Sequence, residues 1–362
     1  MKIAVFHNLP PGGAKRTIYE QVKHLSQNHE LFLFQLSNTN EDYLSLYPFM
    51  KSTKTYSFSL HPSHLVSDYQ KFLILPQIHK LMAQDAEVTD VALIHADFYT
   101  QAPHILRFLK IPSLYFCQEM LRIAYEPELA FTDQVSFPKK YYELTTRQIR
   151  KLVDRSNARS ATTILTNSDF TGAKVQKEFN RPTTTCHLGV DPKIFHPTGQ
   201  PKNNQILFID QKDKISGYDF VLQVLNIIPP KTRPKLEVLS FSKGSPAVSP
   251  QNMAKHYSES LATICTSYNE PFGLAPIESM ACGTPVLAVD EGGYKETVVN
   301  SKTGWLLPRE PKEFARKIID LQHHSEIAKT MGVSGRSHVI QNFTWAKHNS
   351  IVESALCHLA SQ

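Results

Sequence analysis

Residues Asn269–Glu296 read NEPFGLAPIESMACGTPVLAVDEGGYKE, shortly after the apolar segment Ala262–Ser267 (ATICTS). That segment is short and rich in β-branched residues, which predicts a buried strand. Pro271 and Gly273 break the pattern, and LAPIESMAC resumes with helical spacing. A strand that leads through a short loop into a helix presents unpaired backbone N–H groups and the positive end of the helix dipole. The stretch therefore predicts a binding site for phosphate or sugar oxygens.

Strand-like apolar segments alternate with helical patterns along the rest of the chain. The strand-like segments are KIAVFHN, LFLFQL, VALIH, SLYFCQ and TTILTNS in the first half, and QILFID and KLEVLS in the second. This alternation predicts repeated βα winding and an α/β fold. The polar segment from Phe195 to Asn204 fits a linker. We therefore predict two Rossmann-like domains, residues 1–196 and 197–342, that face a central cleft lined by the loops after the strands.

Composition is that of a globular protein of two domains. A chain of 362 residues exceeds what one hydrophobic core usually organises. The five cysteines are scattered without a CxxC pair, so we expect reduced core residues rather than a disulfide or zinc framework. No apolar run approaches the length of a membrane span, and Met1 leads directly into a strand-like segment. These features predict a cytoplasmic protein.

Part of the formal net charge of +6 gathers in residues 139–159. Apolar residues lie on one side of this predicted helix, namely Tyr141, Leu144, Ile149 and Leu152. Such a helix can touch an anionic lipid surface, here the inner face of a membrane, although a solvated helix face gives the same pattern. The basic residues are not interleaved with exposed aromatic residues at a known binding fold, so nucleic acid is not expected as a partner.

Several motifs follow one another in a fixed order. Glu270 and Glu278 enclose seven residues that include Pro-Phe-Gly-Leu, and Ala-Cys-Gly-Thr-Pro-Val follows. The other motifs are Asn167-Ser168, His187-Leu-Gly-Val-Asp191, Glu291-Gly-Gly293 with Glu296, Thr303-Gly-Trp-Leu-Leu307 and Asn342-Phe-Thr-Trp345. In this order the chain resembles the retaining glycosyltransferases of family 4, also called glycosyl transferases group 1, most densely from about Thr162 onward. The resemblance implies a GT-B fold in which a C-terminal helix, residues 343–362, packs back on the first domain.

The same resemblance implies a reaction. A hexosyl group would move with retention from a nucleotide diphosphate sugar, UDP- or GDP-linked, to a hydroxyl acceptor in glycan, glycolipid or polysaccharide assembly. The donor is a substrate, and neither a cofactor nor a metal ion is expected. Because no nucleophile is evident, we expect attack from the face that the diphosphate leaves, with the diphosphate helping to deprotonate the acceptor.

Roles for individual residues follow from the matching motif. Glu278 would accept hydrogen bonds from the ribose hydroxyls, because a carboxylate can take both protons of a vicinal diol. Glu270 would lie beside the donor sugar and stabilise positive charge at its anomeric carbon. The backbone amides of Phe272, Gly273 and Leu274 would bind sugar hydroxyls or phosphate. Outside this motif, the two carboxylates would be interpreted as a helix-dipole partner and a surface residue.

Gly12 and Gly13 form the turn between the first strand and its helix. Residues without a β-carbon let backbone amides approach a diphosphate closely. Two adjacent glycines by themselves indicate only a tight turn. The resemblance implies that this loop approaches the donor phosphates and the acceptor.

The chain departs from the family pattern where two cations usually neutralise the leaving diphosphate. Gln211 stands in the place of the usual Arg and Ser216 in that of the usual Lys. Lys212 and Lys214 are possible substitutes, although loop lysines are commonly only solvated. A diphosphate leaving group needs charge stabilisation. These departures leave open a second hypothesis, a catalytically weak or inactive homologue that acts as a binding or scaffolding subunit.

His95 and Gln118 stand at the ends of two predicted strands and are expected to face the cleft. Gln118 replaces a histidine that many relatives place near the reacting sugar, so it can hydrogen-bond but cannot shuttle a proton. His95 is a candidate for donor or acceptor contacts, and a buried structural histidine fits the pattern as well. Asp97 beside His95 would make only two ligands of a metal site, because no third ligand follows.

Overall fold

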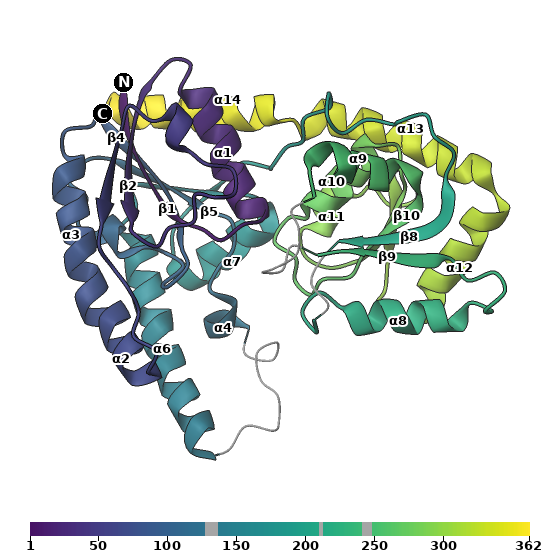
Figure 1. The fold of residues 1–362 in the computed structure, drawn as a ribbon, viewed down its shortest axis with the longest axis horizontal. Coiled ribbons are helices and arrows are strands. Elements are labelled where there is room, and N and C mark those ends of the chain that lie inside the picture. The colour runs from purple at the N-terminus through teal and green to yellow at the C-terminus, as the bar shows by residue number, and fades with distance from the viewer. Residues whose placement is uncertain (127–136, 210–212, 241–247) are drawn as a thin grey trace. The chain divides into compact units, whose positions relative to one another are not determined.

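A computed structural model describes residues 1–126, 137–209, 213–240 and 248–362 (Figure 1). The chain divides into two compact units: unit 1 is Met1–Cys186 with Asn349–Gln362, and unit 2 is His187–His348. The first boundary falls near Cys186, not at 196, because the following segment pairs within unit 2. The amide of Val190 donates to the carbonyl of Phe343 at 3.0 Å.

Unit 1 contains one parallel sheet in the order β3-β2-β1-β4-β5-β6-β7. Its strands are β1 (Lys2–Asn8), β2 (Glu30–Leu36), β3 (Ser52–Tyr56), β4 (Val91–Asp97), β5 (Ser113–Cys117), β6 (Thr163–Thr166) and β7 (Thr184–Thr185). The order runs outward in both directions from the pair β1 and β4, as in doubly wound dinucleotide-binding folds. The carboxyl ends of β1 and β4 therefore meet where the strand order reverses.

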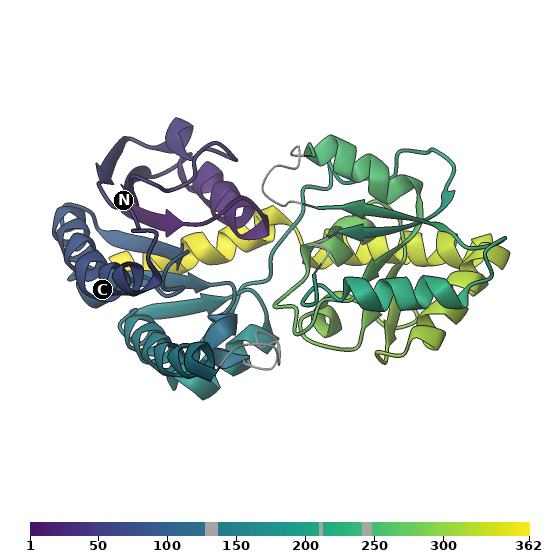
Figure 2. The ribbon, with the colours of Figure 1, turned by 60° about the horizontal axis from the view of Figure 1, so that its bottom comes forward.

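Helices cover both faces of this sheet (Figures 1 and 2). They are α1 (Gly13–Leu25), α2 (His64–Tyr69), α3 (Leu75–Ala86), α4 (Arg122–Tyr125), α6 (Phe137–Arg159) and α7 (Asp169–Phe179), with short turns η1 (Tyr47–Phe49), η2 (Gln70–Ile74) and η3 (His104–Arg107). Phe6 and Ile94 from the strands pack with Met82 from α3 and Ala158 from α6 in one buried cluster. This packing holds β1 and β4 in place, and with them the loops that follow their carboxyl ends.

Unit 2 repeats the plan with a five-stranded parallel sheet in the order β12-β11-β10-β8-β9. Its strands are β8 (Asn203–Ile209), β9 (Lys235–Leu239), β10 (Ser260–Cys265), β11 (Val286–Val289) and β12 (Gly304–Leu307). Its helices are α8 (Tyr218–Ile227), α9 (Pro250–Glu259), α10 (Leu274–Ala281), α11 (Tyr294–Thr297), α12 (Pro311–His323) and α13 (Ser325–Asn342). Every residue of β10 is buried, which confirms the strand predicted just before the Glu270 motif.

The last helix, α14 (Trp345–Ala360), begins in unit 2 and continues in unit 1. Within unit 1 it packs on α1, because Asn349 Nδ2 donates to the carbonyl of Glu20 at 3.2 Å and Glu353 accepts from His24 at 2.7 Å. The helix starts at Trp345, close to the predicted start at 343. No helix in the described part of the chain combines the length and apolarity needed to cross a bilayer.

Candidate functional site

The loops after β8 and β10 lie side by side at the carboxyl edge of the unit 2 sheet, because β8 and β10 are neighbours where the strand order reverses. The amide of Tyr268 donates to the carbonyl of Ile215 at 2.9 Å. Gly217 has φ +75, and a β-carbon there would stand 2.5 Å from the carbonyl oxygen of Thr266. Glycine is thus required for this close approach, which brings the Glu270 loop against the loop that contains Ser216.

Glu270 lies half-buried in the loop that precedes α10. Its carbonyl accepts a hydrogen bond from the amide of Gly293 at 2.8 Å. A β-carbon on Gly292 would approach the carbonyl oxygen of Glu270 to 2.5 Å, and one on Gly293 would approach Cα of Phe272 to 2.5 Å. The two glycines after β11 therefore let that loop pack directly on the backbone of the Glu270 loop and hold it in place.

Glu278 lies on α10 and is only 3% exposed. The Tyr257 hydroxyl, which comes from the end of α9, donates to Glu278 Oε2 at 2.8 Å. Burial and the neighbouring Glu278 charge raise the pKa of Tyr257, so the phenol keeps its proton and acts as a donor. The sequence reasoning missed Tyr257, which lies 21 residues before its partner and carries no motif of its own.

The predicted amides of Phe272, Gly273 and Leu274 stand at the start of α10. The Phe272 side chain is buried and stacks on His187 with ring centroids 5.7 Å apart, so only its backbone can serve a ligand. Gly273 is the N-cap of α10, and no side chain caps the helix there. Leu274 is the first helical residue. Such an end offers backbone donors and a positive dipole to an anion.

Of the three predicted donor-binding residues after β8, only Ser216 lies among the described residues; Gln211 and Lys212 lie outside them. Ser216 is buried. Its amide donates to Asp213 Oδ1 and its hydroxyl to the Asp213 carbonyl, both at 2.8 Å. The Thr266 hydroxyl donates to the Ser216 carbonyl at 2.9 Å. In this structure Ser216 closes a turn and ties it to the end of β10.

Arg309, which follows β12, is a further residue at this sheet edge that the sequence reasoning missed. Its guanidinium forms a two-pronged ion pair with Glu291, with nitrogen–oxygen distances of 2.9 and 2.6 Å. It also donates to the carbonyl of Thr266 at 2.8 Å and lies 3.6 Å from the ring centroid of Tyr268. Arg309 therefore joins the loops after β10 and β11. In the sequence, only its place shortly after the apolar strand β12 could have indicated that Arg309 lies at this sheet edge.

In unit 1, Gly12 and Gly13 begin α1 as predicted. Gly12 is the N-cap, and no side chain caps the helix. The amide of Arg16 donates to the carbonyl of Gly12 at 3.1 Å. A β-carbon on Gly12 would meet no atom within 4 Å. The turn is thus open on the side where a β-carbon would point.

The structure brings His95 and Gln118 together beneath this turn. His95 is fully buried, and its Nε2 lies 2.6 Å from Gln21 Oε1 on α1. Gln118 Nε2 lies 3.5 Å from His95 Nδ1 and donates to the carbonyl of Ala14 at 3.2 Å. Both side chains therefore contact α1, Gln118 at its first turn and His95 farther along, at Gln21.

Asp97, the residue considered with His95 as a metal ligand, is engaged in other contacts. Asn8 Nδ2 donates to its Oδ1 at 2.8 Å and the Thr100 hydroxyl to its Oδ2 at 3.0 Å. Burial raises its pKa, although these hydrogen bonds act in the opposite direction. Across the described ranges, no three His, Cys, Asp or Glu side chains come together as a metal site would need.

Comparison with known proteins finds a family match for part of the chain. The model of the family "Glycosyl transferases group 1" matches residues 245–338. The D-inositol 3-phosphate glycosyltransferase of Streptomyces bingchenggensis is 34% identical over 118 residues, 32% of this chain and 26% of that protein. The alpha-1,3/1,6-mannosyltransferase of Mus musculus is 24% identical over 60% of this chain and 63% of its own length. These matches span less than two thirds of the relatives.

Solved structures share the whole architecture. A sucrose-phosphate synthase from Thermosynechococcus elongatus superposes with a TM-score of 0.75 at 18% identity, over 99% of both chains. Anabaena HepE in complex with UDP and glucose superposes with a TM-score of 0.73 at 16% identity, over 98% of this chain and 99% of that one. At such identities the likeness concerns the fold. Residues 245–338 therefore match the glycosyl transferases group 1 family, and the chain has two Rossmann-like units of the GT-B fold.

Proposed function

We propose that the protein transfers a hexosyl group, with retention, from a nucleotide diphosphate sugar to a hydroxyl acceptor in glycan or glycolipid assembly. One observation carries this proposal. Glu270 precedes the uncapped start of α10 and Glu278 lies within that helix, at the sheet edge where the strand order of unit 2 reverses. Ligands of open α/β sheets bind at such reversals.

The relatives support a sugar-nucleotide donor. Two of them are named as an inositol phosphate glycosyltransferase and a mannosyltransferase, and the HepE structures contain UDP or UDP-glucose. Uridine nucleotides are accordingly the first donors to test, and guanosine nucleotides the second. Only the first of these two names states an acceptor, so the acceptor is left at the level of a hydroxyl group.

Each residue of the α10 region has a chemical part in the proposal. The Glu278 carboxylate accepts from the Tyr257 hydroxyl, and because a carboxylate offers about four acceptor positions it can also accept from ribose hydroxyls. Glu270 stabilises positive charge at the anomeric carbon as the diphosphate leaves. The amides from Phe272 to Leu274 bind sugar hydroxyls or phosphate oxygens. The acceptor hydroxyl attacks the anomeric carbon from the face that the diphosphate leaves, the bond from that carbon to the diphosphate breaks, and the departing diphosphate takes the hydroxyl proton.

A thermal-shift panel of UDP, GDP, ADP and their sugar conjugates tests the donor class. A ligand at about a hundred times its dissociation constant stabilises a fold by about 2.7 kcal/mol. We expect one base family to stabilise the protein, Glu278→Ala to abolish that shift, and Glu270→Ala to keep it while reducing turnover. Glu310→Ala, at the exposed N-cap of α12, is the matched control and should behave as the parent.

The opposite results are equally informative. If no ligand of the panel shifts the melting temperature of the parent protein, the binding or scaffolding subunit would be favoured over a transferase. Parental transfer rates in both Glu270→Ala and Glu278→Ala would show that the site lies elsewhere.

We also propose that α6 makes the peripheral membrane contact. Four apolar side chains are exposed on it: Tyr141, Leu144, Ile149 and Leu152. Its cations are largely engaged within the protein, because Arg150 lies 3.6 Å from Asp68 and Lys151 lies 2.8 Å from Glu178. The main support for a membrane contact of α6 is therefore that its exposed apolar side chains can insert into lipid, rather than that its cations can pair with anionic headgroups.

Vesicle co-sedimentation tests the membrane contact. We expect binding to vesicles that contain anionic lipid, a large loss of binding in the Tyr141→Ser, Leu152→Ser double variant, and little change in Lys140→Ser. Equal binding by all three proteins would refute the assignment to this face.

A further inference from the structure

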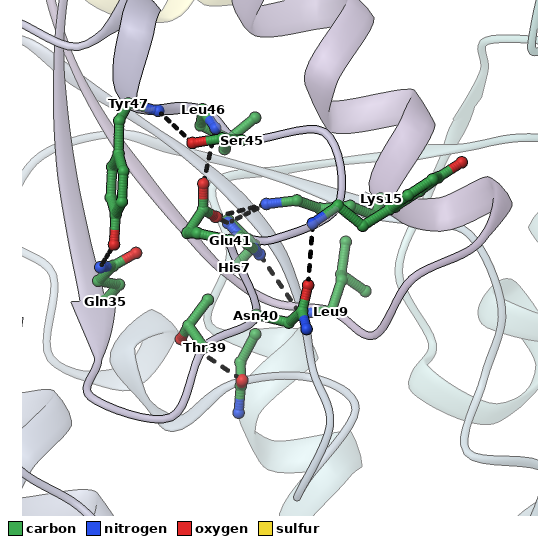
Figure 3. A network of polar contacts seen from close by, with 12 residues as sticks. His7, Leu9, Lys15, Gln35, Thr39, Asn40, Glu41, Ser45, Leu46 and Tyr47 are labelled. Atoms are coloured by element: carbon green, nitrogen blue, oxygen red, sulfur yellow. Dashed lines mark hydrogen bonds and ion pairs between the residues drawn. The ribbon is translucent and has the colours of Figure 1, made fainter. Parts of the chain in front are cut away.

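Three charged or titratable side chains meet near the start of α1, the helix that follows the turn with Gly12 and Gly13 (Figure 3). His7 comes from β1, Lys15 from the first turn of α1, and Glu41 from the loop after β2. The side chains of His7 and Lys15 are fully buried, and that of Glu41 is 7% exposed. Glu41 Oε1 accepts from His7 Nε2 at 2.9 Å and pairs with the Lys15 ammonium.

The backbone favours one tautomer of His7. The amide of Leu9 donates to His7 Nδ1 at 3.3 Å, which places the proton of the neutral ring on Nε2, 2.9 Å from Glu41 Oε1 and 3.1 Å from Lys15 Nζ. Burial lowers the pKa of His7 to about 4, against the opposing effect of the hydrogen bond that His7 donates to Glu41, so the ring is neutral at pH 7. The cluster thus holds one cation, Lys15, and one anion, Glu41.

Glu41 consequently joins three segments of chain. Through His7 it holds Leu9, where the turn begins, and through Lys15 it holds the helix that follows the turn. Its other oxygen, Oε2, accepts from the amide of Leu46 at 2.6 Å, which fixes its own loop (Figure 3). Burial acts to raise the pKa of Glu41, but the hydrogen bonds from His7 and Lys15 prevail and lower it to about 2.

We propose that Glu41 is a positioning residue that sets the conformation of residues 9–13, and with it the placement of the amides at the start of α1. The inference rests on the proposed function in one respect: it takes this turn as the part of unit 1 that meets donor phosphate or acceptor. Preorganised donors of this kind lose effect when they are displaced by about 1 Å. The role of Glu41 is therefore conformational and local.

The experiment must separate positioning from stability. Glu41→Gln alone leaves Lys15 as an unpaired buried cation, which destabilises any fold. The Lys15→Met, Glu41→Gln double variant removes both charges together and should recover most of the lost stability. Glu353→Gln is the matched control, because Glu353 likewise accepts from two side chains, His24 at 2.7 Å and His29 at 2.9 Å, at the opposite end of α1.

Two readouts follow, each on the full chain. Hydrogen exchange of peptides covering residues 8–16 should be about tenfold faster in the double variant, with the other peptides of unit 1 unchanged, because only local opening is altered. The affinity for UDP-glucose and the rate of its hydrolysis should each fall by about tenfold or more. Glu353→Gln should change neither readout. A purely structural role would raise exchange throughout unit 1 instead.

Parental exchange in residues 8–16 of the double variant would overturn the inference. If the parent protein itself binds no UDP-glucose, the donor assumption fails separately, and exchange alone then decides whether Glu41 controls the turn. Faster local exchange with parental affinity and hydrolysis would also overturn it, because the turn would then be free to move without consequence for the ligand.

Discussion

The turn at residues 9–13 in unit 1 and the loop at residues 268–273 in unit 2 both lie where the strand order of a sheet reverses, but they are held by different means. Buried charge holds the first, since Glu41 connects Leu9 and Lys15. Backbone packing holds the second, because Gly292 and Gly293 pack directly against the backbone from Glu270 to Phe272. A charged network responds to pH and to single charge changes, whereas a steric contact responds only to added volume.

The largest effect is expected where volume is added to the packed loop. Gly293→Ala would place a β-carbon 2.5 Å from Cα of Phe272, so backbone must shift. We expect a loss of about 3 kcal/mol or more in the free energy of unfolding, and loss of any nucleotide-induced thermal shift. Denaturant unfolding measures the first quantity. Lys295→Ala on the same segment should change it by less than about 0.5 kcal/mol.

If Gly293→Ala lowered the free energy of unfolding by less than about 1 kcal/mol, the loop at residues 268–273 would be able to shift and would not be sterically fixed. The contrast between the two units would then disappear.

A smaller effect is expected from the one hydroxyl that supports the unit 2 site. Tyr257→Phe removes the hydrogen bond to the buried Glu278, and bonds to charged groups contribute about 1.5 to 3 kcal/mol. We expect a loss of stability in that range and weaker nucleotide binding by calorimetry. Tyr141→Phe, an exposed tyrosine, serves as the control. Weaker binding without lost stability would show that Tyr257 orients Glu278 for the ligand and contributes little to the fold.

The smallest effect, taken per unit of pH, concerns acid. The pKa of His7 is lowered to about 4 by burial, so between pH 6.5 and 4 the unfolded chain binds more protons than the folded one. The His7 contribution therefore makes the free energy of unfolding fall with falling pH, by up to about 1.4 kcal/mol per pH unit. Nuclear magnetic resonance of the ring, assigned with His7→Asn, should show a midpoint near 4. A midpoint near the ordinary value of 6.5 would mean that the ring is accessible to water and that charge does not hold the turn as described.

Local pattern was sufficient to predict the fold class and most of the elements. The strand before Glu270 and the start of α10 were predicted from apolar runs and a Pro-Gly break. Strand β3 was missed, because its sequence STKTY is polar and lies exposed at the edge of the sheet. An edge strand has one solvated face and one neighbour, so it carries no buried pattern.

The sequence by itself determined the α/β winding and predicted the family resemblance and the carboxylates of the α10 region, because periodicity and motif spacing are local properties of the chain. Only the tertiary structure revealed the partners of those groups. Tyr257 meets Glu278 across 21 positions, and Lys15 meets Glu41 across 26. Such pairs depend on which strands become neighbours, and that choice is made by packing of the whole sheet, which no short stretch of sequence encodes.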